Sequence, residues 1–325
     1  MDTRKCLPDV LIIGAPKAGT SALHSALAGH PQIFASPIKE PKYYLCADAP
    51  PPAYRGPGDA HSQQEWIWRA EDYRALFADS PAEAVRLEST PFYLYLPHAR
   101  RRLAEELPAA KFIAVIRDPI DRAYSNWMHL WVDGLEPEAD FVRAWRSEKH
   151  RIDAGWAPFW HYRQLGRYGE QLADLSARVG LERILVLRYK QLVAEPTVTL
   201  NRVCEFLGIA TDVVASVPQD NSRPFVRPGL RATVLGRTIR AGSAAGSLVR
   251  PELWRQAARP IHKALQYGQP AQRPRLAPEI RAELVQEFSD DIALLESLLN
   301  TSYADWRSSI GSGSFSERTG PVAQG

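Results

Sequence analysis

Four short runs of apolar residues alternate with segments of helical periodicity along the first two thirds of the chain. The apolar runs are typical of buried strands and lie at 10–13, 84–87, 112–116 and 184–187. Apolar residues at helical spacing lie between these runs, at 21–28, 70–78, 99–107, 122–131 and 165–178. The alternation predicts an α/β fold in which helices cover a parallel sheet and ligands bind at the carboxyl ends of the strands.

The remaining segments break this pattern and predict insertions, a C-terminal helix and a tail. Residues 48–62 contain four prolines and predict a loop or lid, whereas 136–160 form a Trp-rich insertion of mixed character. An amphipathic helical pattern begins at Pro278. The Gly/Ser-rich stretch 307–325 predicts a disordered tail. We therefore expect a single domain over residues 1–306.

The composition is that of an ordinary globular protein. The chain has 325 residues, of which 45% are hydrophobic and 24% charged, and its net charge of +3 gives no reason to expect a nucleic-acid partner. Cys6, Cys46 and Cys204 form no even disulfide framework, which is typical of a reducing cytoplasm. No apolar run approaches the roughly 20 residues of a transmembrane helix, and Asp9 interrupts the apolar residues near the start. We expect a cytoplasmic protein.

The first apolar run leads directly into a loop that suits an anion. Gly14 and Gly19 let the backbone close around an oxyanion, and the next helix begins with unpaired amide donors. In the nucleotide P-loop a lysine precedes the final Ser/Thr, but here Thr20 takes that place and the lysine is Lys17, three positions earlier. A lysine there lies over the first phosphate group, so the loop predicts a single 5′-phosphoryl group that carries something transferable. In the alternative interpretation the glycines only make a sharp turn and Lys17 is solvated.

A second anion site is predicted after the apolar run 112–116. Arg117 stands at the carboxyl edge of the sheet, Asp118 can cap the next helix, and Pro119 can occupy its first position. Ser125 follows about two turns into that helix. A guanidinium and a hydroxyl so placed form a phosphate clamp. The alternative is that Arg117 pairs with a structural carboxylate and Ser125 lies on the surface.

Together the two sites resemble those of the sulfotransferase family that uses 3′-phosphoadenosine 5′-phosphosulfate (PAPS). Residues 14–21 look like the 5′-phosphosulfate loop of that family, and 117–125 look like its 3′-phosphate motif. Residues 39–44 are similar to the Lys-Glu stretch of its carbohydrate-type and bacterial branches, and 88–93 to a second family stretch. The likeness covers roughly residues 9–306 and implies a P-loop-like three-layer α/β fold.

The resemblance implies PAPS as the donor, adenosine 3′,5′-bisphosphate (PAP) as the product, and no metal. Residues 184–192, which include Tyr189, match the later sheet and helix of the family. Related enzymes close a loop over the nucleotide where this chain has Arg223 and Arg227, and we expect Arg227 in particular near the 3′-phosphate. The expected nucleotide contacts are therefore Lys17, Ala18, Gly19, Thr20, Ser21, Arg117, Ser125, Tyr189, Arg223 and Arg227.

Sulfuryl transfer requires positioning and charge stabilisation, as phosphoryl transfer does. Lys17 is expected to neutralise charge on the bridging oxygen. Glu40 is expected to take the acceptor proton, which is the role that the resemblance implies. In the alternative interpretation, Glu40 and its neighbouring lysines only form a solvated charged turn. His98, which follows a stretch expected near the pocket, is the second candidate base. We expect His24 to be exposed on its helix and His161 to serve packing.

The acceptor is less well determined than the donor. Several carbohydrate-type members have a lysine directly after the glutamate that matches Glu88, where this chain has Ser89, so that cationic contact is absent or supplied elsewhere. We expect a hydroxyl of a small glycosylated or aromatic molecule, or of a glycolipid, between the insertions at 48–62 and 136–160. Six tryptophans could offer walls, although packing is expected for at least half of them: Trp66, Trp68, Trp127, Trp131, Trp156 and Trp160.

Two other functions stay open. A P-loop-type kinase is the enzymatic alternative, against which stand the displaced lysine and the lack of a strand-end aspartate for magnesium. A polyanion-binding module is the non-enzymatic alternative, because residues 223–263 hold eight arginines and one lysine against Glu252. Beyond Arg227 these arginines are expected on an exposed helix face that contacts an anionic or lipid-linked acceptor. The oligomeric state has no signature in the sequence.

Overall fold

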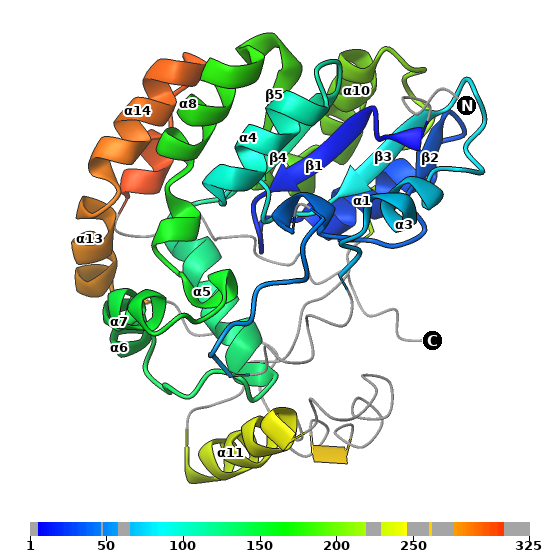
Figure 1. The fold of residues 1–325 in the computed structure, drawn as a ribbon. Coiled ribbons are helices and arrows are strands. Elements are labelled where there is room, and N and C mark those ends of the chain that lie inside the picture. Colours follow the sequence, from blue (N-terminus) through cyan, green and yellow to red (C-terminus); the bar gives the residue numbers. More distant parts are fainter. Residues whose placement is uncertain are drawn as a thin grey trace, which may run out of the picture.

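A computed structural model of the chain describes residues 6–46, 48–57, 66–218, 229–245, 260–261 and 276–308. Five parallel strands form one sheet in the order β2-β3-β1-β4-β5 (Figure 1). The strands are β1 (Val10–Gly14), β2 (Ile33–Ala35), β3 (Val85–Ser89), β4 (Lys111–Ile116) and β5 (Ile184–Arg188). Four of them were predicted from the apolar runs, and the edge strand β2 was missed. It has only three residues, two of them half-buried, so it lacks the continuous apolar run of a central strand.

Alternation along the strands divides the apolar side chains between two cores. Leu11 and Ile13 of β1 face one core, whereas Val10 and Ile12 face the other. The first core is covered by α4 (Pro97–Glu106), α5 (Pro119–Val132), α8 (Tyr168–Val179) and α14 (Ser289–Leu299). The second is covered by α1 (Thr20–Ala28), α9 (Tyr189–Ala194) and α10 (Pro196–Leu207). The predicted three-layer α/β fold with a central parallel sheet flanked by helices is therefore confirmed.

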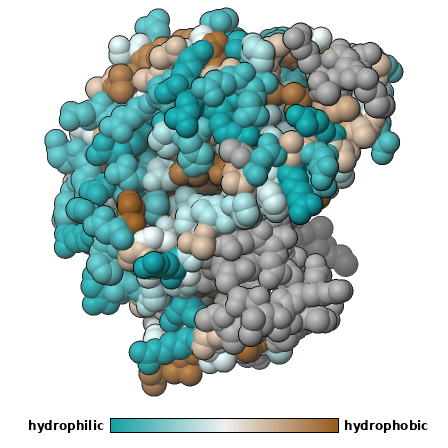
Figure 2. All heavy atoms as spheres, viewed as in Figure 1, coloured by the Kyte–Doolittle hydropathy of each residue, from teal (hydrophilic) through white to brown (hydrophobic). Residues whose placement is uncertain are grey.

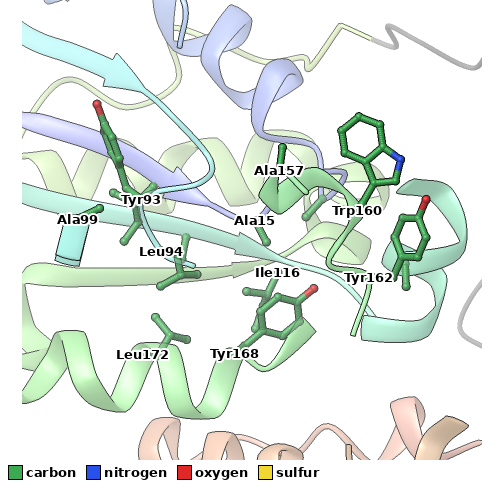
Figure 3. Close-up of a cluster of buried hydrophobic side chains, with 14 of the residues drawn as sticks. Ala15, Tyr93, Leu94, Ala99, Ile116, Ala157, Trp160, Tyr162, Tyr168 and Leu172 are labelled. Atoms are coloured by element: carbon green, nitrogen blue, oxygen red, sulfur yellow. The ribbon is translucent and has the colours of Figure 1, made fainter. Parts of the chain in front are cut away.

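The first core combines aliphatic and aromatic side chains near the end of β4. Ile116 of β4 lies beside Leu94, with Tyr168 and Leu172 of α8 packed beneath them (Figure 3). Hydrophobic residues on the visible face of the molecule form small separate patches within a mostly hydrophilic surface (Figure 2). Burial of apolar surface in the two cores is thus the main stabilising term for the sheet and its helices.

The insertion at 136–160 is folded. It forms α6 (Phe141–Arg146), α7 (Glu148–Asp153) and the short 3₁₀ turn η4 (Pro158–Trp160). Arg151 pairs with Glu136 at 2.7 Å with both side chains buried, and the hydroxyl of Tyr162 donates to the same carboxylate. These bonds satisfy the buried carboxylate and tie the start of the insertion to its later part.

The C-terminal pattern that begins at Pro278 contains two helices, not one. Helix α13 (Pro278–Gln286) ends where Phe288 turns into the first core, and α14 starts at Ser289. Asp291 of α14 accepts hydrogen bonds from the amides of Gly169 and Glu170, at 3.0 and 2.9 Å, and so caps the start of α8.

The other described helices are short or lie at the edge of the fold. They are α3 (Ala70–Ala75), α11 (Leu230–Ala245), η2 (Tyr43–Leu45), η5 (Gln164–Gly166), η6 (Leu181–Arg183) and η8 (Ala304–Arg307). Within the described ranges, no helix is both long and apolar enough to cross a bilayer. The predicted tail lies outside those ranges from residue 309 onward.

Candidate active site

The predicted anion loop lies between the end of β1 and the start of α1. The amide of Ala15 donates to the carbonyl of Val115 at 2.7 Å, which ties the loop to the neighbouring strand β4. Lys17 has a φ of +65° and Gly19 a φ of +93°. Gly19 is the N-cap of α1 and makes no side-chain cap, so the first amides of the helix have no side-chain acceptor at that position. Such a helix start binds oxyanions.

Sheet topology places this loop beside the predicted second anion site. After β1 the chain moves toward β2 and β3, whereas after β4 it moves toward β5 on the other side. The carboxyl ends of β1 and β4 therefore flank a topological switch point, where doubly wound sheets bind ligands. Lys17 follows the first of these strands and Arg117 follows the second.

Tyr189 joins the two predicted sites. The guanidinium of Arg117 lies over its ring, 4.8 Å from the centroid. A Cβ added to Gly19 would lie 2.8 Å from Cδ2 of the same ring. One aromatic ring therefore contacts both the loop that follows β1 and the arginine that follows β4.

A cavity of about 240 Å³ lies next to Arg117. Its wall includes Tyr189, Lys190 and Trp306, which are aromatic or cationic groups. Arg188, also in the wall, pairs with Asp305 at 2.5 Å. The cavity is large enough for part of a nucleotide and extends the surface formed by Arg117 and Tyr189.

The local structure predicted around the second site is confirmed, and the helix it begins is anchored from the C-terminus. The carboxylate of Asp118 accepts from the amides of Ile120 and Asp121, both at 3.0 Å, and Pro119 occupies the first position of α5. Asp118 also pairs with the buried Arg281 of α13. Ser125 is half-buried on this helix. The predicted alternative that Arg117 pairs with a structural carboxylate is not supported, because its guanidinium lies over the ring of Tyr189.

Glu40 lies on a short loop that is tied to both neighbouring elements. Its backbone has a φ of +61°, and its amide donates to the carbonyl of Ser89 at the end of β3 at 3.0 Å. Lys39 Nζ donates to Glu40 Oε1 at 2.8 Å and to Ser21 Oγ at 2.9 Å. Since Ser21 belongs to the first turn of α1, these two bonds connect the candidate base to the anion loop.

A buried carboxylate below this loop was not singled out for chemistry by the sequence. Glu88 is fully buried and accepts hydrogen bonds from Tyr73 and Thr90 at 2.7 Å and from Tyr93 at 3.2 Å. Burial raises the pKa of Glu88 to about 7, although these three hydrogen bonds favour the charged form. The signals in the sequence were an acidic residue at the end of an apolar run and the resemblance of residues 88–93 to a family stretch.

The expectation that His24 is exposed was wrong. His24 is buried, and its Nδ1 lies 2.8 Å from Ser89 Oγ. Burial and then the charge of Lys39 lower the pKa of His24 to about 4, so the ring is neutral at pH 7. The helical pattern misplaced it because α1 is buried on a wide face that includes Thr20 as well as the expected leucines.

Two further histidines, His98 and His161, have structural partners. His98 lies at the start of α4 with Nε2 3.2 Å from the carbonyl of Leu45, and partial burial of its ring lowers its pKa. His161 is buried between Tyr95, whose hydroxyl lies 2.8 Å from Nδ1, and the carbonyl of Trp156. Packing was the expectation for His161 and is confirmed, whereas a catalytic role for His98 stays a prediction.

Packing was expected for at least half of the six tryptophans; three of them are buried, and the other three, including Trp156, are half-buried. Trp127, Trp131 and Trp160 are buried, and the first two stack in parallel. Trp66 and Trp68 are half-buried. They lie beside the Glu40 loop, since the amide of Ile67 between them donates to the carbonyl of Pro41. Lys42 lies over the ring of Trp66, and Arg69 over that of Trp68, at 5.2 and 5.0 Å.

Part of the predicted site cannot be placed. Arg223 and Arg227 lie outside the described ranges, as does most of the arginine-rich segment. Arg240, which was expected on an exposed face, is half-buried and donates to the carbonyls of Gly134 and Glu136 at 2.8 and 3.2 Å. Among the described residues no group of His, Cys, Asp and Glu has the arrangement of a metal site.

Comparisons with known proteins agree with this geometry. Residues 8–212 match the sequence model described as Sulfotransferase family. The heparan sulfate glucosamine 3-O-sulfotransferase 3B1 of Mus musculus is 27% identical over 206 residues, covering 63% of this chain and 47% of that protein. The bifunctional heparan sulfate N-deacetylase/N-sulfotransferase 1 of Caenorhabditis elegans is 26% identical over 211 residues, covering 64% of this chain and 23% of that protein.

The chain thus spans about half, or less, of the length of these curated relatives. A solved structure gives a likeness over nearly the whole chain. The crystal structure of a sulfotransferase from Alicyclobacillus acidocaldarius is 27% identical, with a TM-score of 0.71, and the match covers 93% of this chain and 99% of that chain. The likeness therefore includes the C-terminal helices as well as the sheet.

Proposed function

Because the chain belongs to the PAPS-dependent sulfotransferase family, we propose that it transfers the sulfuryl group of PAPS to an acceptor hydroxyl. The observation that carries this proposal is the contact of Tyr189 with both Gly19 and Arg117. These contacts support the proposal because they bring the residues that follow β1 and β4 against one ring at the switch point of the sheet, where a nucleotide with phosphate groups at both ends of its ribose could bind.

The residues of the anion loop fit the 5′ end of the donor. The amides of Ala18, Gly19, Thr20 and Ser21 lie where α1 begins without a side-chain cap, and they bind the 5′-phosphate together with the two hydroxyls. The ammonium of Lys17 lies on the same loop and stabilises the negative charge of the leaving phosphate. Arg117, with Ser125 on α5, holds the 3′-phosphate, and Tyr189 supports the guanidinium from below.

The transfer itself moves one group and one proton. The acceptor oxygen forms a bond to sulfur while the bond from sulfur to the bridging phosphate oxygen breaks, and the electron pair of that bond stays with PAP. The proton of the acceptor hydroxyl passes to the carboxylate of Glu40. Glu40 suits this role better than His98, because Glu40 is bonded through Lys39 to the first turn of α1, whereas His98 is bonded to Leu45.

We further propose that the acceptor is a small glycosylated or aromatic molecule or a glycolipid. The half-buried rings of Trp66 and Trp68 lie beside the Glu40 loop and offer flat apolar walls. Lys42 and Arg69 lie over these rings and would favour an acceptor with negative groups. The three cysteines are free, which fits work in a reducing compartment such as the cytoplasm.

The kinase alternative receives no support from the strand ends. Asp118, which follows β4, accepts from two helix amides and pairs with Arg281, so it is committed to capping and ion pairing. The polyanion-binding alternative rests on residues 223–263, of which only 229–245 and 260–261 are described. It is not needed to account for the site at the sheet edge.

Mass spectrometry tests the proposed function directly. The protein is incubated with PAPS and a panel of hydroxyl compounds that includes glycosides, phenols and glycolipids. We expect one of these classes to gain the mass of a single sulfate while PAP accumulates in equal amount. If PAPS is consumed only by hydrolysis at the rate found without protein, and PAP does not bind, the proposal is wrong.

A further inference from the structure

Lys39 connects two groups that the proposed mechanism uses separately. Its ammonium donates to Ser21 Oγ at 2.9 Å and to Glu40 Oε1 at 2.8 Å. Ser21 stands in the first turn of α1, where the donor oxyanions are expected, and Glu40 is the candidate base. The side chains of both Lys39 and Glu40 are 30% exposed, so the pair lies at the mouth of the site and can be reached by substrate.

The first bond fixes how the Ser21 hydroxyl is used. An ammonium has three hydrogens and no lone pair, so Lys39 can only donate, and Ser21 Oγ accepts. The hydroxyl hydrogen of Ser21 is then left to donate. Lys39 therefore orients Ser21 as a donor toward an anion at the start of α1.

The second bond makes Glu40 a competitor of that anion. Two neighbouring titratable groups are His24 of α1, whose pKa burial lowers to about 4, and Glu88 of β3, which is buried. Neither supplies a positive charge to the carboxylate of Glu40. Lys39 is the cation bonded to it, and a donor oxyanion that contacts the same ammonium would weaken that bond.

We propose that Lys39 is a positioning residue shared between the donor and Glu40, so that binding of the donor releases the Glu40 carboxylate to accept the acceptor proton. This inference rests on the proposed sulfuryl transfer. Without donor, Lys39 holds Glu40 and Ser21 together. With donor, the ammonium and the Ser21 hydroxyl turn to the donor oxyanions, and the base becomes available only when there is a group to transfer.

Thermodynamic linkage predicts whether loss of the Glu40 charge strengthens or weakens donor binding. If the donor and the Glu40 carboxylate compete for Lys39, removing the carboxylate charge must strengthen binding of the donor nucleotide. The Glu40→Gln variant should therefore bind PAP more tightly than the wild type by about fivefold, even though it loses turnover. The gain should depend on Lys39, because a general reduction of negative charge would act without it.

The experiment is a calorimetric titration of PAP into four proteins: wild type, Glu40→Gln, Lys39→Met and the double variant. We expect Lys39→Met to weaken PAP binding by about tenfold, and Glu40→Gln to change affinity by less than about twofold in the Lys39→Met background. Lys39→Arg should restore most of the affinity, since arginine can donate to the same groups. Lys149→Met, which removes a similar 2.8 Å ion pair on exposed α7, is the control and should bind PAP as the wild type does.

The outcomes separate this inference from the proposed function. If the wild type neither binds PAP nor transfers sulfate, the proposed function fails. If the wild type does both, but Glu40→Gln binds PAP no more tightly, the sharing of Lys39 is wrong, and that single variant decides the matter even if Lys39→Met does not fold. Equal tightening by Glu40→Gln in both backgrounds would also overturn it, because the effect would not pass through Lys39.

Discussion

At the scale of single residues, the candidate site concentrates unusual backbone geometry. Lys17, Glu40 and Lys42 have φ values of +65°, +61° and +64°, in the left-handed region that L-residues with a Cβ rarely adopt. Each such residue costs about 1–3 kcal/mol, and the cost is tolerated where the surrounding structure and function require it. Two of these three are the side chains to which we assign chemistry.

Lys17→Ala should remove the cation that stabilises the leaving phosphate. We expect turnover to fall by at least about 100-fold, the loss that follows removal of one group that stabilises transition-state charge. The fold should persist, because Lys17 is half-exposed. Steady-state rates with PAPS and an accepted hydroxyl compound provide the measurement, and a variant that keeps most of its turnover would refute the assignment.

Glu88→Gln should change how stability depends on pH. The folded protein holds the Glu88 proton up to about pH 7, whereas a glutamate of ordinary pKa 4.5 loses it earlier. The folded state therefore binds more protons between these values, and stability from this group is present below pH 4.5 and lost as pH rises through 7. The pKa difference corresponds to about 3 kcal/mol.

Urea unfolding of wild type and Glu88→Gln at several pH values measures this contribution as a difference. We expect the wild type to lose about 3 kcal/mol relative to the variant between pH 4.5 and 7. The difference is needed because His24 and His161, with pKa values lowered to about 4 by burial, act in the opposite direction over much of this range. A difference that stays constant with pH would contradict the buried, protonated Glu88.

At the scale of elements, the site depends on how closely α9 approaches the anion loop. Tyr189, the first residue of α9, contacts Gly19 and supports Arg117, so a six-residue helix controls the distance between the two anion sites. A side chain at position 19 would meet the ring at 2.8 Å and would also be strained at a φ of +93°. The glycine is therefore needed for two separate reasons.

Gly19→Ala and Gly208→Ala form a matched pair that separates these reasons. Gly208 has a φ of +77° but open space around its missing Cβ, so alanine there should cost only the backbone strain of about 1 kcal/mol. At Gly19 the contact with Tyr189 adds to the strain, and we expect a loss of about 2–4 kcal/mol. Thermal unfolding and PAP titration measure the two effects. Equal stability losses, or unchanged PAP binding in Gly19→Ala, would argue against the contact.

At the scale of the whole molecule, the C-terminal helices hold the start of α5 and thereby the second anion site. Arg281 of α13 is buried and pairs with Asp118 and with Asp121, the latter at 3.0 Å. Asp118 in turn caps the helix that follows Arg117. A segment 160 residues away in the chain thus supports the arginine expected to bind the 3′-phosphate.

Arg281→Met should destabilise the protein by about 3–5 kcal/mol, because Asp118 would remain buried without its cation. Adding Asp118→Asn should recover part of that loss, since the uncompensated charge is removed. Chemical unfolding of the single and double variants measures both steps. If the double variant is no more stable than Arg281→Met, the buried charge is not the cause.

The sequence predicted the parts of this fold that depend on local patterns. The runs at 10–13 and 112–116 are buried on both faces, so continuous apolar residues identified β1 and β4. Tertiary contacts decided the rest: Phe288 enters the first core and separates α13 from α14, which a helical pattern alone does not reveal.

The same division applies to the candidate site. The order of strand, glycine loop and helix identified the surroundings of Lys17, and the cap at Asp118 identified those of Arg117. The bond from Lys39 to Ser21 and the pair of His24 with Ser89 join residues 18 and 65 positions apart, and no periodicity encodes such pairs. These contacts form only when the folded chain brings α1 against β3 and against the loop that holds Lys39.

The central claim is that two basic sites at one edge of the sheet bind the two ends of one nucleotide. Calorimetric titration of PAP into wild type, Lys17→Ala and Arg117→Ala tests it most directly. We expect micromolar affinity for the wild type and a loss of at least about tenfold in each variant, because each removes charge-assisted hydrogen bonds to a phosphate. Absence of PAP binding to the wild type, or equal affinity in all three proteins, would contradict it.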